Sequence, residues 1–212
     1  MKPDYLVYAV TDPRLQSRPR LVEAVESAIK GGATIVQLRE KSATGKEFLE
    51  AATQLKALTE RYRVPLIIND RIDIAQLVQA GLHIGQEDIP LSEARRLLPT
   101  ATIGVSVSTV EQAISAEQNG ADYLGVGSLF PTATKNDATF MSKETLHAIR
   151  QAVELPLVGI GGITLENVSE VGTAVDGFAV VSALFAQPDV ERATREFKEA
   201  AKQVHQSVSD RV

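Results

Sequence analysis

Short apolar runs alternate with amphipathic stretches along the whole chain. Most of the runs are apolar almost throughout, which is typical of parallel strands that are covered on both faces. Between the runs, apolar residues recur at helical spacing, as at Leu21, Val25, Ala28 and Ile29. The pattern predicts eight strands, at residues 5–10, 33–38, 65–69, 82–84, 102–106, 121–126, 156–160 and 177–182.

Eight strand–helix units in 212 residues predict an α/β fold, a single (β/α)8 TIM barrel. The rival is a doubly wound open sheet, which normally has a Gly-rich turn after its first strand. Here the first strand leads into Thr11-Asp12-Pro13, and this favours the barrel. We expect one domain over residues 1–212, with a short C-terminal helical tail that begins at Asp189.

Composition narrows the classes of function. The chain has no cysteine, which excludes disulfides, thiolate metal sites and cysteine nucleophiles. Its formal net charge is −5, so we do not expect a nucleic acid partner. No apolar run approaches the roughly 20 residues of a membrane helix, and we recognise no signal peptide. We therefore expect a cytoplasmic protein without a membrane partner, and leave open whether it is a homo-oligomer.

Polar residues collect where the predicted strands end, the face that carries the chemistry in a TIM barrel. Alternation along the second strand places Gln37, Arg39 and Lys41 on one side. Two cations and an amide in this arrangement suit a diphosphate. A solvated strand end, with the cations paired to Glu40, explains the same pattern equally well.

Two carboxylates follow the next two strands. Asp70, with Asn69 before it, follows the third predicted strand, and Asp88 follows the fourth. Beside a diphosphate they would suit Mg²⁺, which takes oxygen ligands and few protein contacts. For Asn69 and Asp70 alone, capping of the next helix is the stronger explanation. We interpret His83 as a strand histidine with a structural hydrogen bond rather than a ligand.

The last four strands end in candidates for anion binding. Ser106 ends the fifth strand, where a loop cap is the commoner explanation, and the long irregular stretch 127–141 contains Lys135. Gly161-Gly162 follow the seventh strand and Val181-Ser182 the eighth, the usual phosphate site of these barrels. The residues thus predict a barrel mouth with a backbone cradle for a monophosphate and a cationic site for a diphosphate.

The same segments carry a family resemblance. They are, in order, Tyr8–Asp12, Val36–Lys41, Ile68–Arg71, His83–Asp88, Gly104–Ser106, Gly125–Gly127 with Pro131–Lys135, Gly159–Ile163 and Val181–Ala183. Over roughly residues 5–186 the chain resembles the thiamine phosphate synthases. Each motif alone is a weak signal, but eight of them in order at barrel spacing are specific.

The resemblance implies a reaction and a set of roles. 4-Amino-2-methyl-5-hydroxymethylpyrimidine diphosphate would condense with 4-methyl-5-(2-hydroxyethyl)thiazole phosphate to give thiamine phosphate and pyrophosphate, with Mg²⁺ as the cofactor. These small molecules would be the partners. The pyrimidine diphosphate would be held by Gln37, Arg39, Lys41, Asn69, Ser106 and Lys135, of which Ser106 and Lys135 would be catalytic. The thiazole phosphate would contact Thr132, Thr134, Gly162, Val181 and Ser182, and Mg²⁺ would bind to Asp70 and Asp88.

Two other classes remain as alternatives. A thiazole tautomerase-like isomerase shares the barrel and the phosphate cradle but uses a histidine after the fifth strand, where this chain has Ser108. A non-catalytic barrel that binds thiazole phosphate would not need Asp70, Asp88 and Lys135 together. Two loop positions depart from the usual family pattern, Ser128 and Asn136, and both lie outside the positions matched above. The synthase is favoured over both alternatives.

Overall fold

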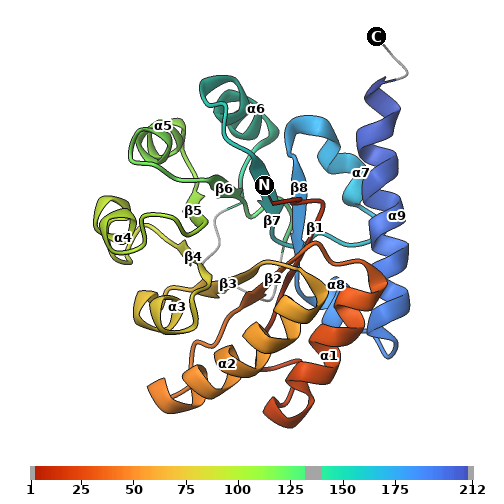
Figure 1. Cartoon of the computed structure of the whole chain (residues 1–212). Helices are drawn as coiled ribbons and strands as arrows, with labels where there is room; N and C mark the ends of the chain where they lie inside the picture. The colour runs from red at the N-terminus through yellow and green to blue at the C-terminus, as the bar shows by residue number, and fades with distance from the viewer. Residues whose placement is uncertain (1–2, 132–139, 210–212) are drawn as a thin grey trace.

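Eight parallel strands form a closed barrel in the computed structural model, which describes residues 3–131 and 140–209. Each strand pairs with the next, and β8 pairs with β1. The strands are β1 (Val7–Val10), β2 (Ile35–Leu38), β3 (Leu66–Asn69), β4 (Gly81–Ile84), β5 (Ile103–Val107), β6 (Tyr123–Val126), β7 (Leu157–Ile160) and β8 (Gly177–Val180). Figure 1 shows them at the centre, with the helices around them. The predicted TIM barrel is confirmed.

All eight predicted strands are present, and each predicted end lies within two residues of the observed one. The apolar runs located them well because five of the eight strands are buried at every position, on the barrel side and on the helix side. The segments between the strands supply the helices: α1 (Arg18–Gly31), α2 (Gly45–Tyr62), α3 (Ile72–Val78), α4 (Leu91–Leu97), α5 (Val110–Gln118), α6 (Lys143–Ala152), α7 (Val168–Val171), the 3₁₀ helix η1 (Gly172–Ala174), α8 (Ser182–Phe185) and α9 (Val190–Ser209).

The segment expected to be a short tail forms α9, a helix of 20 residues. Phe197 and Ala201 on this helix are buried. α9 also packs closely on α1, since a Cβ at Gly31 would lie 2.6 Å from the Cβ of Thr194. In Figure 1 it lies along the side of the barrel, so it is a full member of the outer helical layer. Within the described ranges, no helix has the length and apolarity needed to cross a membrane.

Two separate cores stabilise the fold. One lies between the strands and the surrounding helices and holds most of the buried aliphatic residues. The other fills the barrel itself and is made of Tyr5, Tyr8, Val10, Ile35, Ile67, Tyr123, Val158 and Ala179. In the described part of the chain, the barrel is therefore packed below its mouth, and the carboxyl ends of its strands are where a ligand would bind.

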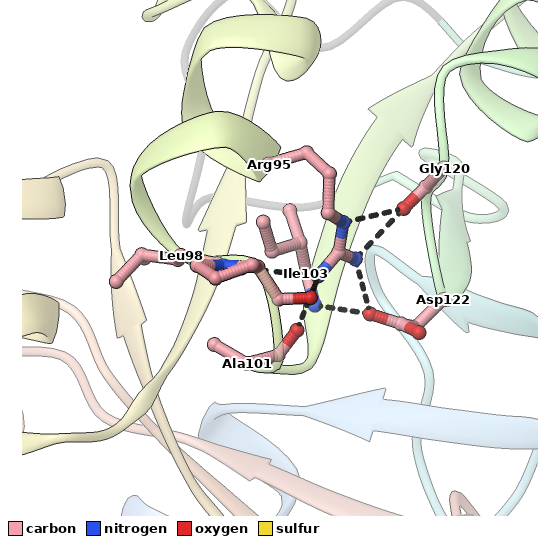
Figure 2. Close-up of polar contacts among 7 residues, drawn as sticks. Arg95, Leu98, Ala101, Ile103, Gly120 and Asp122 are labelled. Atoms are coloured by element: carbon pink, nitrogen blue, oxygen red, sulfur yellow. Dashed lines mark hydrogen bonds and ion pairs between the residues drawn. The ribbon is translucent and has the colours of Figure 1, made fainter.

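An arginine on α4 ties together the amino ends of β5 and β6 (Figure 2). The Arg95 guanidinium donates to the carbonyls of Ala101 and Gly120, both at 2.7 Å, and to the Asp122 carboxylate at 2.6 Å. Asp122 in turn accepts the backbone N–H of Ile103 at 2.7 Å. This network lies at the end of the barrel away from the strand carboxyl ends, so we assign it to stability rather than to chemistry.

The same arrangement recurs two strands later. Arg150 on α6 donates to Asp176 at 3.0 Å, and Asp176 accepts the backbone N–H of Leu157, the first residue of β7, at 2.7 Å. In both cases the aspartate precedes an even-numbered strand and holds the first N–H of the odd-numbered strand before it. The paired networks anchor two successive strand–helix–strand units in the same way.

Candidate active site

A cavity of about 390 Å³ opens at the carboxyl ends of the strands. Its lining contains every site residue predicted from the sequence that the structure describes: Gln37, Arg39, Lys41, Asn69, Asp70, Asp88, Ser106, Gly162, Val181 and Ser182. Residues far apart in the chain therefore meet at one mouth, as the barrel fold requires. The other three predicted residues, Thr132, Thr134 and Lys135, lie outside the described residues.

The cationic side of the cavity comes from the end of β2. Gln37 lies deepest and is buried, Arg39 is half-buried, and Lys41 is exposed at the rim. The backbone N–H of Arg39 donates to the Thr11 hydroxyl at 3.0 Å, which fixes the end of β2 to the end of β1. The Lys41 ammonium forms an ion pair with the Asp70 carboxylate at the end of β3.

Among the described residues, Glu40 forms no ion pair with Arg39 or Lys41. Its side chain is buried on the other side of the strand, with a relative exposure of 8%. Burial raises the pKa of the Glu40 carboxyl, and Arg18 is the cation that counteracts this rise. The alternative of a solvated strand end paired to Glu40 is therefore wrong, and the cations face the cavity.

Asp70 has an unusual backbone conformation. Its φ angle is 62°, in the left-handed region that residues other than glycine seldom occupy. Its backbone N–H donates to the carbonyl of His83 at 2.8 Å, which joins β3 to β4. The N-cap of α3 is Arg71, and no side chain caps this helix. Capping by Asn69 or Asp70, the stronger explanation from these two residues alone, is therefore wrong.

Asp88 is the second carboxylate of the cavity. Its Oδ2 accepts the backbone N–H of Gly85 at 2.7 Å, which closes the turn after β4. In the described ranges, no three His, Cys, Asp or Glu residues cluster closely enough to enclose a metal ion. Two carboxylates alone do not make a structural metal site. They fit Mg²⁺, which commonly takes one or two carboxylates and fills its remaining positions with water and phosphate oxygens.

The loop after β7 and the start of α8 form the opposite side of the cavity. Gly161 and Gly162 have φ angles of 97° and 65°. A Cβ at Gly162 would lie 2.4 Å from the carbonyl oxygen of Pro131, so this close approach of two loops requires glycine. Val181 and Ser182, where α8 begins, also line the cavity. Backbone N–H groups at such a helix start have no intrahelical partner, which suits a bound anion.

The sequence did not single out three polar residues that line the cavity, the buried Tyr8 and Tyr123 and the exposed Gln86. The two tyrosines were counted within apolar strands, but a buried hydroxyl needs a hydrogen-bond partner, and this need was the available signal. His83 makes the structural hydrogen bonds expected of it, to the Ser106 hydroxyl at 2.8 Å and to the Tyr123 hydroxyl at 2.9 Å. Burial raises the pKa of both Tyr8 and Tyr123 above the usual value, so both phenols stay protonated.

Comparison with known proteins connects this cavity to one family. Residues 7–184 match the family model described as thiamine monophosphate synthase (TMP-TENI). The thiamine-phosphate synthase of Ruminiclostridium cellulolyticum is 50% identical over 201 residues, which cover 93% of this chain and 96% of that protein. The thiamine-phosphate synthase of Pyrococcus abyssi is 45% identical over 200 residues, covering 93% and 95%.

A solved structure gives the same result for the fold. The thiamine phosphate pyrophosphorylase from Pyrococcus furiosus superimposes with a TM-score of 0.88 at 40% identity. The superposition covers 96% of this chain and 98% of that one. The similarity therefore extends over nearly the whole of both chains.

Proposed function

The chain belongs to the thiamine monophosphate synthase family, and we propose that the cavity at its barrel mouth is where it joins its two substrates. The enzyme condenses the hydroxymethylpyrimidine diphosphate with the hydroxyethylthiazole phosphate and releases thiamine phosphate and pyrophosphate. We place the reaction there because one cavity is lined by all ten described residues that the sequence predicted to bind the two substrates and the metal.

The pyrimidine diphosphate is proposed to lie against the ends of β2 and β3. Negative charge builds up on the diphosphate as the bond between its oxygen and the pyrimidine methylene carbon breaks. Arg39 and Lys41 would neutralise that charge, and Gln37, Asn69 and Ser106 would supply hydrogen bonds from the floor and sides of the cavity. Such groups stabilise the departing pyrophosphate more than the intact substrate, and this difference accelerates the reaction.

Mg²⁺ dependence is part of the proposal. Asp70 and Asp88 would hold the metal ion, and their position on the same cavity supports this role. When bound, Mg²⁺ would add positive charge beside the diphosphate. Lys41 would then exchange its contact with Asp70 for one with the substrate.

The thiazole phosphate is proposed to occupy the opposite side of the mouth. Its phosphate would be held by backbone groups of Gly162, Val181 and Ser182. Thr132 and Thr134, which lie outside the described residues, would also contact it. Lys135 from the same stretch would contact the departing diphosphate instead. The ring nitrogen attacks with its own lone pair, so no general base is needed. The apolar walls at Val158, Ile160 and Ala179 would exclude water from the reacting carbon.

The decisive experiment supplies the purified protein with both substrates and Mg²⁺. Thiamine phosphate and pyrophosphate should form in equal amounts, and omission of either substrate or addition of a chelator should stop the reaction. Absence of product, with binding of thiazole phosphate retained, would favour the isomerase or the non-catalytic barrel.

We also propose a cytoplasmic location, because both substrates are charged phosphate esters.

A further inference from the structure

Five side chains form an unbroken line of hydrogen bonds across the barrel interior. The Nε2 of Gln37 donates to the Tyr8 hydroxyl at 2.8 Å, and this hydroxyl bonds to that of Tyr123 at 2.7 Å. The Tyr123 hydroxyl bonds to Nδ1 of His83 at 2.9 Å, and Nε2 of His83 bonds to the Ser106 hydroxyl at 2.8 Å. The line thus links five different strands, β2, β1, β6, β4 and β5.

Two glycines make room for this line. A Cβ at Gly104 would lie 2.0 Å from Cζ of Tyr123, much closer than van der Waals contact allows. A Cβ at Gly125 would lie 3.1 Å from Cε1 of His83 and 3.7 Å from the Ser106 hydroxyl oxygen. The polar line therefore occupies space that the neighbouring strands leave free, and close packing holds its members in place.

The Gln37 amide at the start of the line determines which group donates and which accepts in every later hydrogen bond. A hydroxyl has one proton, and the Tyr8 hydroxyl oxygen already accepts from the Gln37 amide. Tyr8 is 1% exposed, and Tyr123 is the only acceptor for its proton among the residues that the structure describes. Tyr8 therefore donates to Tyr123. Tyr123 is also fully buried, and Nδ1 of His83 is the acceptor left for its proton among the residues that the structure describes, so Tyr123 donates to His83.

The last two members of the line, His83 and Ser106, are bonded in the same direction. A neutral imidazole carries one proton, so acceptance at Nδ1 puts the proton of His83 on Nε2. Nε2–H then donates to the Ser106 oxygen, which leaves the Ser106 proton free to point elsewhere. Ser106 lines the cavity, so its proton is available to a ligand bound there.

We propose that Tyr8, Tyr123 and His83 are positioning residues that hold the Ser106 hydroxyl as a hydrogen-bond donor towards the departing diphosphate. This inference rests on the proposed function, because it takes the ligand in front of Ser106 to be the pyrimidine diphosphate. With the opposite direction of bonds, Ser106 would donate to His83 and could only accept from the ligand. A phosphate oxygen carries no proton to give at this stage, so that arrangement would not stabilise it.

The first test measures the tautomer of His83 in the unaltered protein without substrates. The chain has three histidines, His83, His147 and His205, so ¹⁵N-histidine labelling gives few signals. Variants His147→Gln and His205→Gln assign the two others by loss of their signals. Long-range ¹H–¹⁵N correlation spectra should show the His83 proton on Nε2, and a proton on Nδ1 would overturn the proposal.

The second test asks whether Tyr123 acts through Ser106. Tyr123→Phe removes only the hydroxyl and keeps the packed ring. It should lower kcat about tenfold with little change in the KM of the diphosphate, because loss of a single aligned donor costs up to 10²–10³. In a Ser106→Ala background the same change should lower kcat less than twofold. An equal loss in both backgrounds, or no loss in either, would contradict the proposal.

A matched control is available on the outer layer. Tyr62, the last residue of α2, donates its hydroxyl to Glu26 at 2.6 Å and does not line the cavity, so Tyr62→Phe should leave kcat unchanged. If the protein forms no thiamine phosphate under any condition, the proposed function fails. The tautomer of His83 still decides the direction of the hydrogen-bonded line in that case, so the two failures are distinguishable.

Discussion

The Lys41 ammonium contacts the Asp70 carboxylate, so a residue proposed for the diphosphate is paired with one proposed for the metal ion. The lysine side chain is 54% exposed and the aspartate 22%. Ion pairs this open to solvent stabilise a protein by about 0–1 kcal/mol. The contact therefore neutralises two site residues while the substrates are absent and is weak enough to be exchanged when they bind.

Removal of Lys41 should separate metal binding from diphosphate binding. In Lys41→Met, Mn²⁺ used as a probe should bind the free enzyme up to about fivefold more tightly, because Asp70 loses a competing cation worth at most about 1 kcal/mol. The KM of the pyrimidine diphosphate should rise about tenfold. Electron paramagnetic resonance titration and steady-state kinetics measure the two effects. Lys46→Met, at an exposed position on α2, is the control, and weaker Mn²⁺ binding in Lys41→Met would contradict the exchange.

Asp88 offers a test of how the cavity is divided between its two ligands. Asp88→Asn keeps an oxygen that accepts the Gly85 N–H, so the turn after β4 is preserved while the charge is lost. The Mg²⁺ concentration for half-maximal rate should rise by at least about tenfold, and the KM of thiazole phosphate should change less than about twofold. Glu87→Gln, at the exposed neighbouring position, should change neither value. A large rise in the thiazole phosphate KM with unchanged Mg²⁺ dependence would show that our division of the mouth is wrong.

The sequence predicted the positions of the strands because burial on two faces makes most of them apolar almost throughout. It also predicted that Arg39, Asp88 and Ser106 share one mouth, because the fold alone brings the strand carboxyl ends together. Local sequence pattern and the topology of the barrel are therefore enough to bring the site residues together at one mouth.

Contacts between individual side chains could not be predicted in the same way. The partner of Lys41 is Asp70, 29 residues further on, and nothing in the local pattern prefers it to the adjacent Glu40. The left-handed backbone of Asp70 likewise depends on the bond from its N–H to the carbonyl of His83 on the next strand. Such features depend on strand register and loop packing, so they become visible only in three dimensions.

The Arg95 network at the amino ends of the strands should affect stability without affecting catalysis (Figure 2). Arg95→Met removes charged hydrogen bonds to Ala101, Gly120 and Asp122 and should lower the free energy of unfolding by about 1–3 kcal/mol. Urea denaturation measures this loss. The kcat should stay within about twofold of the unaltered enzyme, since the cavity lies at the other end of the barrel. Arg96→Met, which breaks only an exposed pair within α4, should cost less than about 0.5 kcal/mol, and equal losses in the two variants would refute the assignment.

Glu47 should give the protein a stabilising contribution that depends on pH. The hydrogen bond from Arg18, and then those from the Thr44 N–H and hydroxyl, lower the pKa of the Glu47 carboxyl from 4.5 to about 2. A carboxyl with a lower pKa in the folded chain than in the unfolded chain stabilises the fold. The contribution is fully present at pH values above the pKa of the unfolded chain, and it is lost as the pH falls through the pKa of the folded chain. Glu47→Gln should therefore lower the melting temperature at pH 7, and the difference from the unaltered protein should shrink between about pH 4.5 and pH 2.

Thermal unfolding followed by circular dichroism at a series of pH values measures this difference in melting temperature. The control is Glu50→Gln, on the exposed face of the same helix. A difference in melting temperature that stays constant from pH 7 to pH 2 would mean that the charge of Glu47 is not what stabilises the start of α2.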